Sequence, residues 1–332
     1  MSPVEVNEKA PGAGATASAK GGVRRAVWAG VTVLVITCGV VGLYKLEGAV
    51  LSGATGAAVT SVEVRLTGAP AWMPAALVRD IRQSLTPQKL PPREKDLPRA
   101  VYELAAANPW VRRVVSVRRV RSADATKAVV VVEAEFRKPA AMIPSPDGTS
   151  SVLVDTEGYR LPVSHAPRYV AHVRCADGSL REVAFADYND IPPGAGYRRV
   201  HYFRIELDYV RDGEPPEVGK RWDCAALDDA LRLARLVSTR PYAGQITTID
   251  ARNHDGSLDP NEPHLRMYAQ RKRQRATVIK FGRFPHPGGD HIVSPARKMS
   301  YLDAFVADHG GRLAGTKSYL DLRYDELHTS ID

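Results

Sequence analysis

The stretch WVRRVVSVRRVRSADATKAVVVVEAEFR, residues 110–137, decides the fold of the first part of the chain. Its first eleven residues read as a strand, and its last ten begin with a β-branched run that is long enough for a second strand. The polar segment SADATK between them reads as a turn. The sequence therefore predicts two strands joined by a turn.

The residues before this hairpin predict a strand and two helices. Residues 61–66, SVEVRL, alternate with Val62, Val64 and Leu66 on one face, which is typical of a strand. Residues 73–85 carry an apolar residue at every fourth position, which predicts a helix face. Residues 97–109 predict a second helix that Pro109 stops. The predicted order is strand, helix, helix, strand, strand.

A second set of elements follows residue 219. Residues 224–237 predict an amphipathic helix with Leu227, Ala230, Leu231 and Ala234 on one face. Three short runs predict strands in hairpins: residues 246–252, 265–270 and 276–282. Residues 299–310 predict another helix, which Gly310 ends.

Near the N-terminus, residues 26–44 contain no formal charge, and at about 1.5 Å per residue such a helix reaches across a bilayer core of about 30 Å. Basic residues on the N-terminal side predict a cytoplasmic N-terminus. We expect a disordered cytoplasmic tail at 1–25, a transmembrane helix at 26–46 and a linker at 47–60. A cleaved signal peptide and a buried core helix are the alternatives. The residues expected to fix the membrane anchor are Arg24, Arg25, Trp28 and Tyr44.

The 332 residues carry a formal net charge of +9, which makes nucleic acid an obvious first hypothesis for a partner. The predicted topology argues against it, because the folded part would lie outside the cytoplasm. Anionic lipid headgroups, cell-wall polymers and acidic protein faces are the alternatives. Cys175 and Cys224 lie outside the apolar segment, where a disulfide is permitted but not implied.

Several motifs, in this order, resemble the FtsQ/DivIB family of bacterial cell-division proteins. They are VEVRLTG, which ends at Gly68, PWVRRVVSVR with Pro109, Trp110 and Val111, EFRKPA at 135–140, LVDTEGYRLP at 153–162, and YLDLRYD at 319–325. The chain departs from the family where the usual Trp-Pro after the arginine is replaced by Val120 and Arg121. Residues 163–203 do not align, and we interpret them as a lineage-specific insertion.

The resemblance implies an α+β protein with a single N-terminal transmembrane helix. A POTRA domain of order β-α-α-β-β would span 61–137, and a mixed β domain with flanking helices would span 138–328. Proteins of this family are bitopic inner-membrane scaffolds at the division septum. They bind FtsB/FtsL-type coiled-coil partners and link early division proteins to septal cell-wall synthases.

The terminal stretch SYLDLRYD alternates polar and apolar residues, so a strand there can bury leucines and still present an unpaired backbone edge. The resemblance implies that the partner adds a strand at this edge. An ordinary core strand is the alternative. The predicted partner-binding residues are Ser318, Tyr319, Leu320, Asp321, Leu322, Arg323, Tyr324 and Asp325.

No catalytic constellation emerges from the sequence, so we expect no enzyme activity, no cofactor and no metal. The nearest approach to a metal site is residues 251–262, which match a calcium loop at several positions but begin with Ala251 where an aspartate is needed. A polar hairpin loop explains this segment. Two other functions stay open: a membrane-anchored envelope enzyme or sensor that acts through 163–203, and a POTRA-bearing outer-membrane assembly or secretion factor.

Overall fold

The computed structural model describes residues 59–89, 94–124, 126–175, 177–271, 274–285 and 292–331. Val59–Asp332 form one compact unit. The predicted cytoplasmic tail, the predicted transmembrane helix at 26–46 and the linker up to residue 58 lie outside the described residues. The same is true of Arg24, Arg25, Trp28 and Tyr44.

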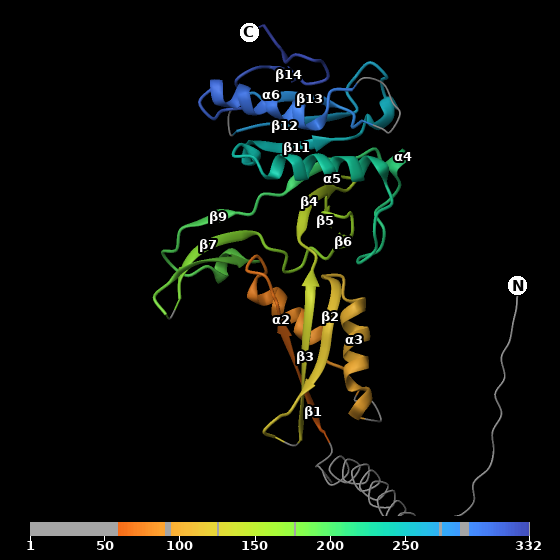
Figure 1. Ribbon diagram of the computed structural model, residues 1–332, viewed down its shortest axis with the longest axis vertical. Helices are drawn as coiled ribbons and strands as arrows, with labels where there is room; N and C mark the ends of the chain where they lie inside the picture. The colour runs from red at the N-terminus through yellow and green to blue at the C-terminus, as the bar shows by residue number, and fades with distance from the viewer. Residues whose placement is uncertain are drawn as a thin grey trace, which may run out of the picture. The chain divides into compact units, whose positions relative to one another are not determined.

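The first sheet has three strands: β1 (Ser61–Thr67), β2 (Val111–Val120) and β3 (Lys127–Phe136). β3 is central, parallel to β1 and antiparallel to β2. Two helices, α2 (Ala75–Ser84) and α3 (Leu97–Ala107), accompany this sheet (Figure 1). Leu77, Ile81 and Val101 from the helices share one core with Val130 and Val132 of β3 because the apolar stripe of each helix faces the buried side of the strands.

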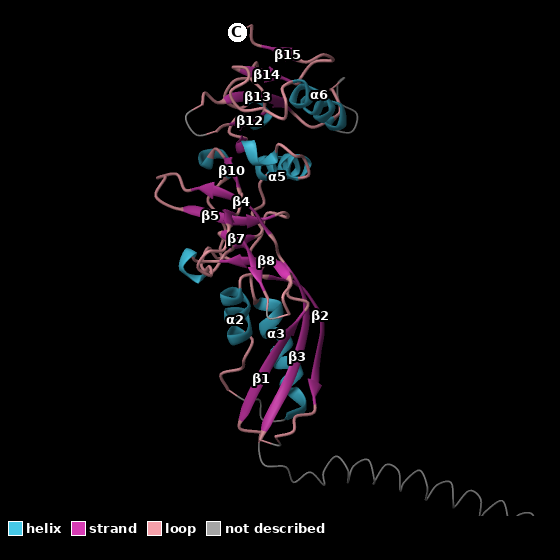
Figure 2. Cartoon of the chain, turned by 90° about the vertical axis from the view of Figure 1, so that its left-hand side faces the viewer, coloured by secondary structure: helices cyan, strands magenta, loops and turns pink. Residues whose placement is uncertain are grey.

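The second sheet has nine strands, in the order β15-β14-β13-β12-β11-β10-β4-β5-β6 (Figures 1 and 2). In chain order the strands are β4 (Pro139–Pro144), β5 (Ser151–Asp155), β6 (Arg160–Leu161), β10 (Phe203–Glu206), β11 (Ile246–Asp250), β12 (Leu265–Ala269), β13 (Thr277–Gly282), β14 (Tyr319–Asp321) and β15 (His328–Thr329). The accompanying helices are α4 (Tyr209–Asp212), α5 (Ala225–Ser238) and α6 (Pro295–Asp308). Leu227 and Leu231 of α5 and Leu302 of α6 share a core with Ile249 and Ile279 of the sheet.

Residues 163–203, which we interpreted as a lineage-specific insertion, contain a third sheet of order β8-β7-β9. Its strands are β7 (Tyr169–Arg174), β8 (Leu180–Phe185) and β9 (Tyr197–Arg199). The rings of Tyr169, Tyr188 and Tyr197 contact one another edge to face, with centroids 5.2–6.0 Å apart. The segment is therefore a folded part of the chain.

Most elements predicted from local patterns are confirmed. The strand, helix, helix, strand, strand order of 61–137 is present, and α5 lies within one residue of its predicted bounds. β11, β12 and β13 form the two predicted hairpins. α6 begins four residues earlier than predicted because Ser294 caps it by accepting a hydrogen bond from the Arg297 amide, with Pro295 in the first turn.

The predicted fold class is wrong as stated. The structure is a mixed α/β fold with a large sheet, in which parallel pairs such as β1–β3, β10–β11 and β13–β14 are interspersed with antiparallel ones. Such parallel pairs need crossover connections, which here include helices, so strands and helices are not segregated as the α+β class requires. Within the described residues, no helix has the length and apolar character to cross a membrane.

The two hydrophobic cores do not divide at residue 137. Leu153 of β5, Leu161 of β6 and Ala166 pack in the core of the first sheet, although they lie beyond the predicted domain boundary. Val152 and Val154 pack in the core of the nine-stranded sheet. Because alternate residues of β5 point to opposite faces, this strand contributes to both cores.

Candidate functional site

Part of the predicted partner-binding segment, Tyr319–Asp321, forms β14. On one side it pairs with β13: the Ser318 carbonyl accepts from the Val278 amide at 3.1 Å, and the Leu322 amide donates to the Lys280 carbonyl at 2.9 Å. Successive peptide groups of a strand point to opposite neighbours. The peptide groups of Tyr319 therefore face away from β13.

β15 occupies the side of β14 that we expected to be unpaired. The chain turns after Asp325, and His328–Thr329 returns antiparallel to β14, with the Ser330 amide donating to the Tyr319 carbonyl at 3.3 Å. The Ser330 hydroxyl also accepts from the Ser318 amide at 2.9 Å. The expectation of an unpaired edge on the terminal strand is corrected: a two-residue strand covers it and forms the outer edge itself.

The strand is also shorter than the predicted segment. Only Tyr319–Asp321 is extended, and Arg323 folds back so that its guanidinium donates to both carboxylate oxygens of Asp321 at 2.8–3.2 Å. Asp325 is held by α6, where Arg297 forms an ion pair with its carboxylate and the Tyr301 hydroxyl donates to its carbonyl. These contacts bend the chain away from the strand direction.

The side chains of the segment follow the predicted alternation only in part. Leu320 and Leu322 are fully buried in the core of the large sheet, as predicted for one face. Asp321 belongs to the polar side of the alternation, yet it is only 4% exposed, because its carboxylate is neutralised by Arg323. Asp321 raises the pKa of Arg323 mainly through this hydrogen bond. Tyr324 is half exposed, with its ring 4.8 Å from that of His328.

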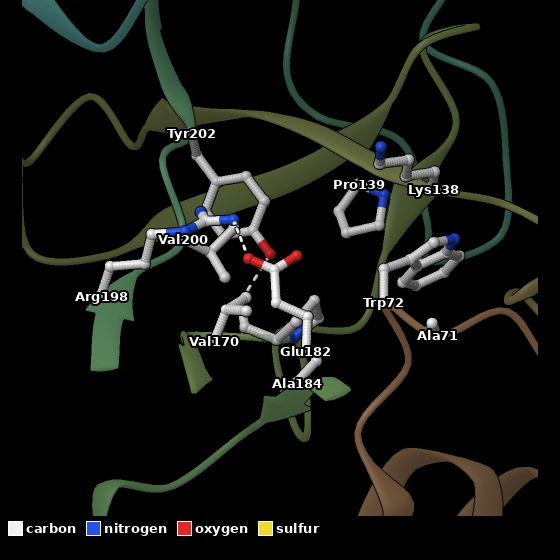
Figure 3. Close-up of a pocket in the computed structure, with 11 residues that line it drawn as sticks. Ala71, Trp72, Lys138, Pro139, Val170, Glu182, Ala184, Arg198, Val200 and Tyr202 are labelled. Atoms are coloured by element: carbon white, nitrogen blue, oxygen red, sulfur yellow. Dashed lines mark hydrogen bonds and ion pairs between the residues drawn. The ribbon is translucent and has the colours of Figure 1, made fainter. Parts of the chain in front are cut away.

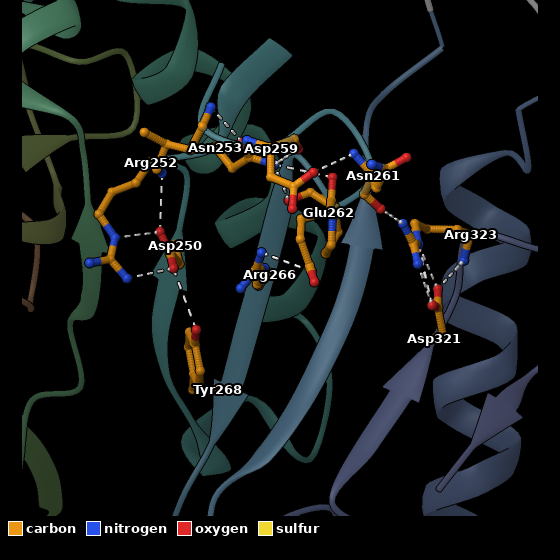
Figure 4. A network of polar contacts seen from close by, with 12 residues as sticks. Asp250, Arg252, Asn253, Asp259, Asn261, Glu262, Arg266, Tyr268, Asp321 and Arg323 are labelled. Carbon is orange, nitrogen blue, oxygen red and sulfur yellow. Dashed lines mark hydrogen bonds and ion pairs between the residues drawn. The ribbon is translucent and has the colours of Figure 1, made fainter. Parts of the chain in front are cut away.

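A polar network joins this segment to the loop between β11 and β12 (Figure 4). The Arg323 guanidinium donates to the Asn261 carbonyl at 3.0 Å. Within the loop, the Asn253 amide group donates to the Asp259 and Glu262 carbonyls, and its oxygen accepts from the Leu258 and Asp259 amides. The loop that resembled a calcium site is therefore organised by a buried asparagine, whose side-chain oxygen already has two amide donors.

A second polar network surrounds Asp250, the last residue of β11. Arg252 donates to both oxygens of this carboxylate at 2.8–2.9 Å (Figure 4). It also lies 3.2 Å from a carboxylate oxygen of Glu206. The pKa of Asp250 is lowered because the hydrogen bonds from Arg252 outweigh the opposing effect of burial. The charges along this side of the sheet are thus largely paired.

Gly68, Pro109, Trp110 and Val111, which we expected to mark a POTRA domain, have structural roles. Trp110 is 3% exposed and packs with Val111 in the core of the first sheet. Gly68 has a φ of +79°, a conformation that favours glycine after β1. Pro109 lies against Gly219, where an added Cβ would come within 3.4 Å of the proline ring. These residues pack the first sheet internally and against the chain that precedes α5.

A cavity of about 260 Å³ lies where the turn after β1, the start of β4 and the sheet β8-β7-β9 meet (Figure 3). It is lined mainly by apolar groups, including Trp72, Pro139, Val170 and Val200. Arg198 of β9 pairs with Glu182 of β8 at 2.9 Å, and Tyr202 donates to the Pro167 carbonyl at 2.6 Å. Burial raises the pKa of the Tyr202 phenol, so the ring stays neutral. No pattern in the sequence indicates this cavity.

Sequence reasoning also missed Lys298. It lies in the first turns of α6, and its ammonium donates to the Phe281 and Arg283 carbonyls at 2.7 and 3.1 Å. Only 1% of its surface is exposed, and burial lowers its pKa to about 8. A lysine in an amphipathic helix is ordinarily read as a solvated residue, so only the structure could reveal this position.

Comparison with known proteins adds nothing to this picture. No protein-family model matches the chain, and no curated protein matches its sequence significantly.

Proposed function

We propose that this chain is a non-catalytic scaffold of the FtsQ/DivIB type in bacterial cell division. Its partner would be an FtsB/FtsL-type coiled-coil protein that adds an extended segment to the β14–β15 edge of the nine-stranded sheet. Through that partner the chain would link early division proteins to the septal cell-wall synthases.

The observation that carries the proposal is the shortness of the edge strand. β15 pairs with β14 at two positions, Leu320 with Thr329 and Asp321 with His328, so little main-chain hydrogen bonding is lost if a partner strand adds beside it or replaces it. Natural proteins use very short edge strands to prevent unspecific pairing, and a dedicated partner can still pair at such an edge. Tyr324 and the outward face of β15 would supply side-chain contacts.

The resemblance in the sequence supports the same function. The motifs that carry it lie in their expected order, and they fall on β1, the start of β2, the β3–β4 junction, β5–β6 and β14. We further propose that the folded part acts outside the cytoplasm, at the inner membrane of the septum. Cell fractionation tests this location, because recovery in the outer membrane would favour the assembly or secretion factor instead.

The decisive test is Tyr319→Pro, measured by capture of the FtsB/FtsL-type partner of the same organism. The substitution removes the Tyr319 amide hydrogen, which faces the β15 side, and leaves the β13 hydrogen bonds of Ser318 and Leu322 in place. We expect capture to weaken at least tenfold, with a cooperative unfolding transition retained.

A matched control is Arg160→Pro on β6, at the opposite edge of the same sheet. There the Arg160 amide donates to the Lys220 carbonyl. We expect this variant to capture the partner as the wild type does. Undiminished capture by Tyr319→Pro, or equal loss in both variants, would contradict docking at the β14–β15 edge.

The cavity beside Trp72 and Tyr202 favours one second candidate, an envelope sensor for a small apolar ligand. Deletion of 169–199, which removes the third sheet but leaves Ala166 and β10 in place, separates the two functions. A scaffold that acts through β14–β15 should still support septation without the third sheet, whereas a sensor that acts through this cavity should fail.

A further inference from the structure

A second cavity, of about 350 Å³, lies beside the start of β7 and the connection from β9 to β10. Its walls are mainly apolar, and they are formed by Met142, Leu153, Val163, Ala166, Arg168, Tyr169, Arg199, Val200 and Tyr202. Val200 and Tyr202 also line the cavity beside Trp72, so the two cavities adjoin at these side chains. We propose that the second cavity binds a single-chain amphiphile with an anionic head group, of the fatty-acid type.

The apolar walls suit a hydrocarbon chain. Leu153 and Ala166 are buried in the core of the first sheet, and Met142 and Val163 pack partly buried against the same core. The side chains of these four residues carry no strong hydrogen-bonding group that an alkyl chain would leave without a partner. Apolar cavities of this kind take up apolar molecules, so burial of the chain would favour binding.

The size of the cavity selects one chain. A cavity of about 150 Å³ holds a benzene ring, and by the same measure 350 Å³ has room for roughly 14 carbon atoms. That number fits the acyl chain of one fatty acid and falls well short of the two chains of a phospholipid.

Two arginines at the cavity suit an anionic head group. Arg168 and Arg199 are exposed to solvent and line the same cavity. They are held close together, because the Val200 amide donates to the Arg168 carbonyl at 2.8 Å and Tyr169 lies opposite Arg199 in the pairing of β7 with β9. Among the described residues neither guanidinium forms an ion pair, and no carboxylate is among the lining residues.

The polar groups of the two cavities differ in a way that favours the second cavity for an anion. In the cavity beside Trp72, Arg198 is already paired with Glu182. In the second cavity, the Tyr202 phenol stays neutral because burial raises its pKa, and the positive charge of Arg168 opposes that rise. A carboxylate head would therefore meet cationic donors and no competing anion in the lining. Because exposed ion pairs are weak, the chain would supply most of the affinity and the arginines would select the sign of the head group.

The inference does not rest on the proposed docking edge, because β14 and β15 contribute no residue to this cavity. The first experiment is isothermal titration of the full chain with laurate, below the concentration at which laurate forms micelles. We expect the wild type to bind and Val163→Trp to bind at least tenfold more weakly, because the indole ring occupies part of the cavity. Val163 is only partly buried and follows β6 in a turn, so the variant should stay folded.

Val170→Trp is the matched control, since Val170 lines the cavity beside Trp72 and not the second cavity. We expect it to bind laurate within about twofold of the wild type. All variants share residues 1–58, so any binding to that segment cancels in the comparison. Absence of binding by the wild type, equal affinity of the wild type and a folded Val163→Trp, equal loss in both tryptophan variants, or loss in Val170→Trp alone would overturn the proposal.

The second experiment tests the head group with exposed side chains, whose replacement leaves the core intact. Arg168→Gln and Arg199→Gln should each weaken laurate binding at least threefold. Arg174→Gln removes the same charge from β7 outside the cavity and should bind as the wild type does. Equal loss in Arg174→Gln would show attraction by net charge alone and would overturn the site.

Two further ligands separate the contribution of the chain from that of the charge. Octanoate should bind more weakly than laurate, by up to about fourfold for each CH₂ group removed. Dodecyltrimethylammonium, which has a cationic head on a chain of the same length as that of laurate, should bind the wild type at least tenfold more weakly than laurate does. Equal binding of the two head groups, or binding to anionic phospholipid vesicles without binding of laurate, would overturn the proposal.

Discussion

Nη1 of Arg137 lies 2.9 Å from Oδ2 of Asp155, and both side chains are almost fully buried. Arg137 follows β3 directly, and Asp155 ends β5, so this ion pair joins the first sheet to the large sheet. Asp155 also accepts from the Glu157 and Tyr159 amides, and the guanidinium of Arg137 stacks 3.4 Å from the centroid of the Tyr159 ring. The EFRKPA motif thus carries a structural contact between sheets.

Replacing Arg137 with methionine should therefore destabilise the fold. The variant leaves the Asp155 carboxylate buried without its cation, which we expect to cost about 3 kcal/mol of unfolding free energy. Urea denaturation measures it. Arg113→Met is the control, because Arg113 forms an exposed pair with Glu135 and its loss should cost less than about 1 kcal/mol. Similar losses in the two variants would contradict a special role for the buried pair.

We expect Lys298 to make the free energy of unfolding depend on pH. Its folded pKa of about 8 lies below its ordinary value, so the unfolded chain binds more protons between these two values. Relative to Lys298→Met, the wild type should therefore gain stability as the pH rises from about 8 to about 10.5, by roughly 2–4 kcal/mol. Denaturation of both proteins at several pH values measures the difference. A difference that is constant across this window would show that Lys298 is not desolvated.

Local sequence patterns predict those helices and strands whose tertiary contacts do not alter the secondary structure that the pattern favours. α5 has apolar residues on one face along its whole length, and its N-terminus is fixed by the thiol of Cys224, which accepts from the Leu227 amide at 3.4 Å. β3 is a run of valines that suits a central strand. For such segments the pattern and the tertiary environment lead to the same structure.

The terminal segment could not be predicted in this way. Its alternation indicates a strand through Asp325, yet contacts from Arg297 and Tyr301, more than twenty residues away, bend it after Asp321. The burial of Lys298 likewise depends on carbonyls of β13 and the residue after it, at least fifteen residues away. Neither the covering strand β15 nor the buried position of Lys298 leaves a periodic signal, because both arise from tertiary contacts.

We expect His254 to make the free energy of unfolding depend on pH in the sense opposite to Lys298. Its Nε2 lies 3.2 Å from Oδ2 of Asp229, and this hydrogen bond is the main reason that its pKa is raised. A raised folded pKa gives stability that is fully present below the unfolded value of about 6.5 and is lost as the pH rises through the folded value.

Asp229→Asn should therefore cost about 1 kcal/mol more at pH 5.5 than at pH 8.5. Thermal or urea unfolding at the two pH values measures this. Asp255→Asn provides the comparison, since Asp255 is largely exposed and contributes less to the raised pKa. An equal cost of Asp229→Asn at both pH values would mean that the imidazole does not ionise in this range.

Asn253 should be the residue on which the β11–β12 loop depends. Its side chain donates to the carbonyls of Asp259 and Glu262 and accepts from the amides of Leu258 and Asp259, at 2.9–3.1 Å. Asn253→Ala leaves these partly buried backbone groups without this partner, which should destabilise the protein by roughly 2–4 kcal/mol. Asn261→Ala, in the same loop, should cost less than about 0.5 kcal/mol because Asn261 contributes its carbonyl, not its side chain, to the contact with Arg323. Calcium should shift the unfolding midpoint of neither the wild type nor the two variants. A calcium-dependent rise of the midpoint for the wild type alone would restore the calcium-loop interpretation of residues 251–262.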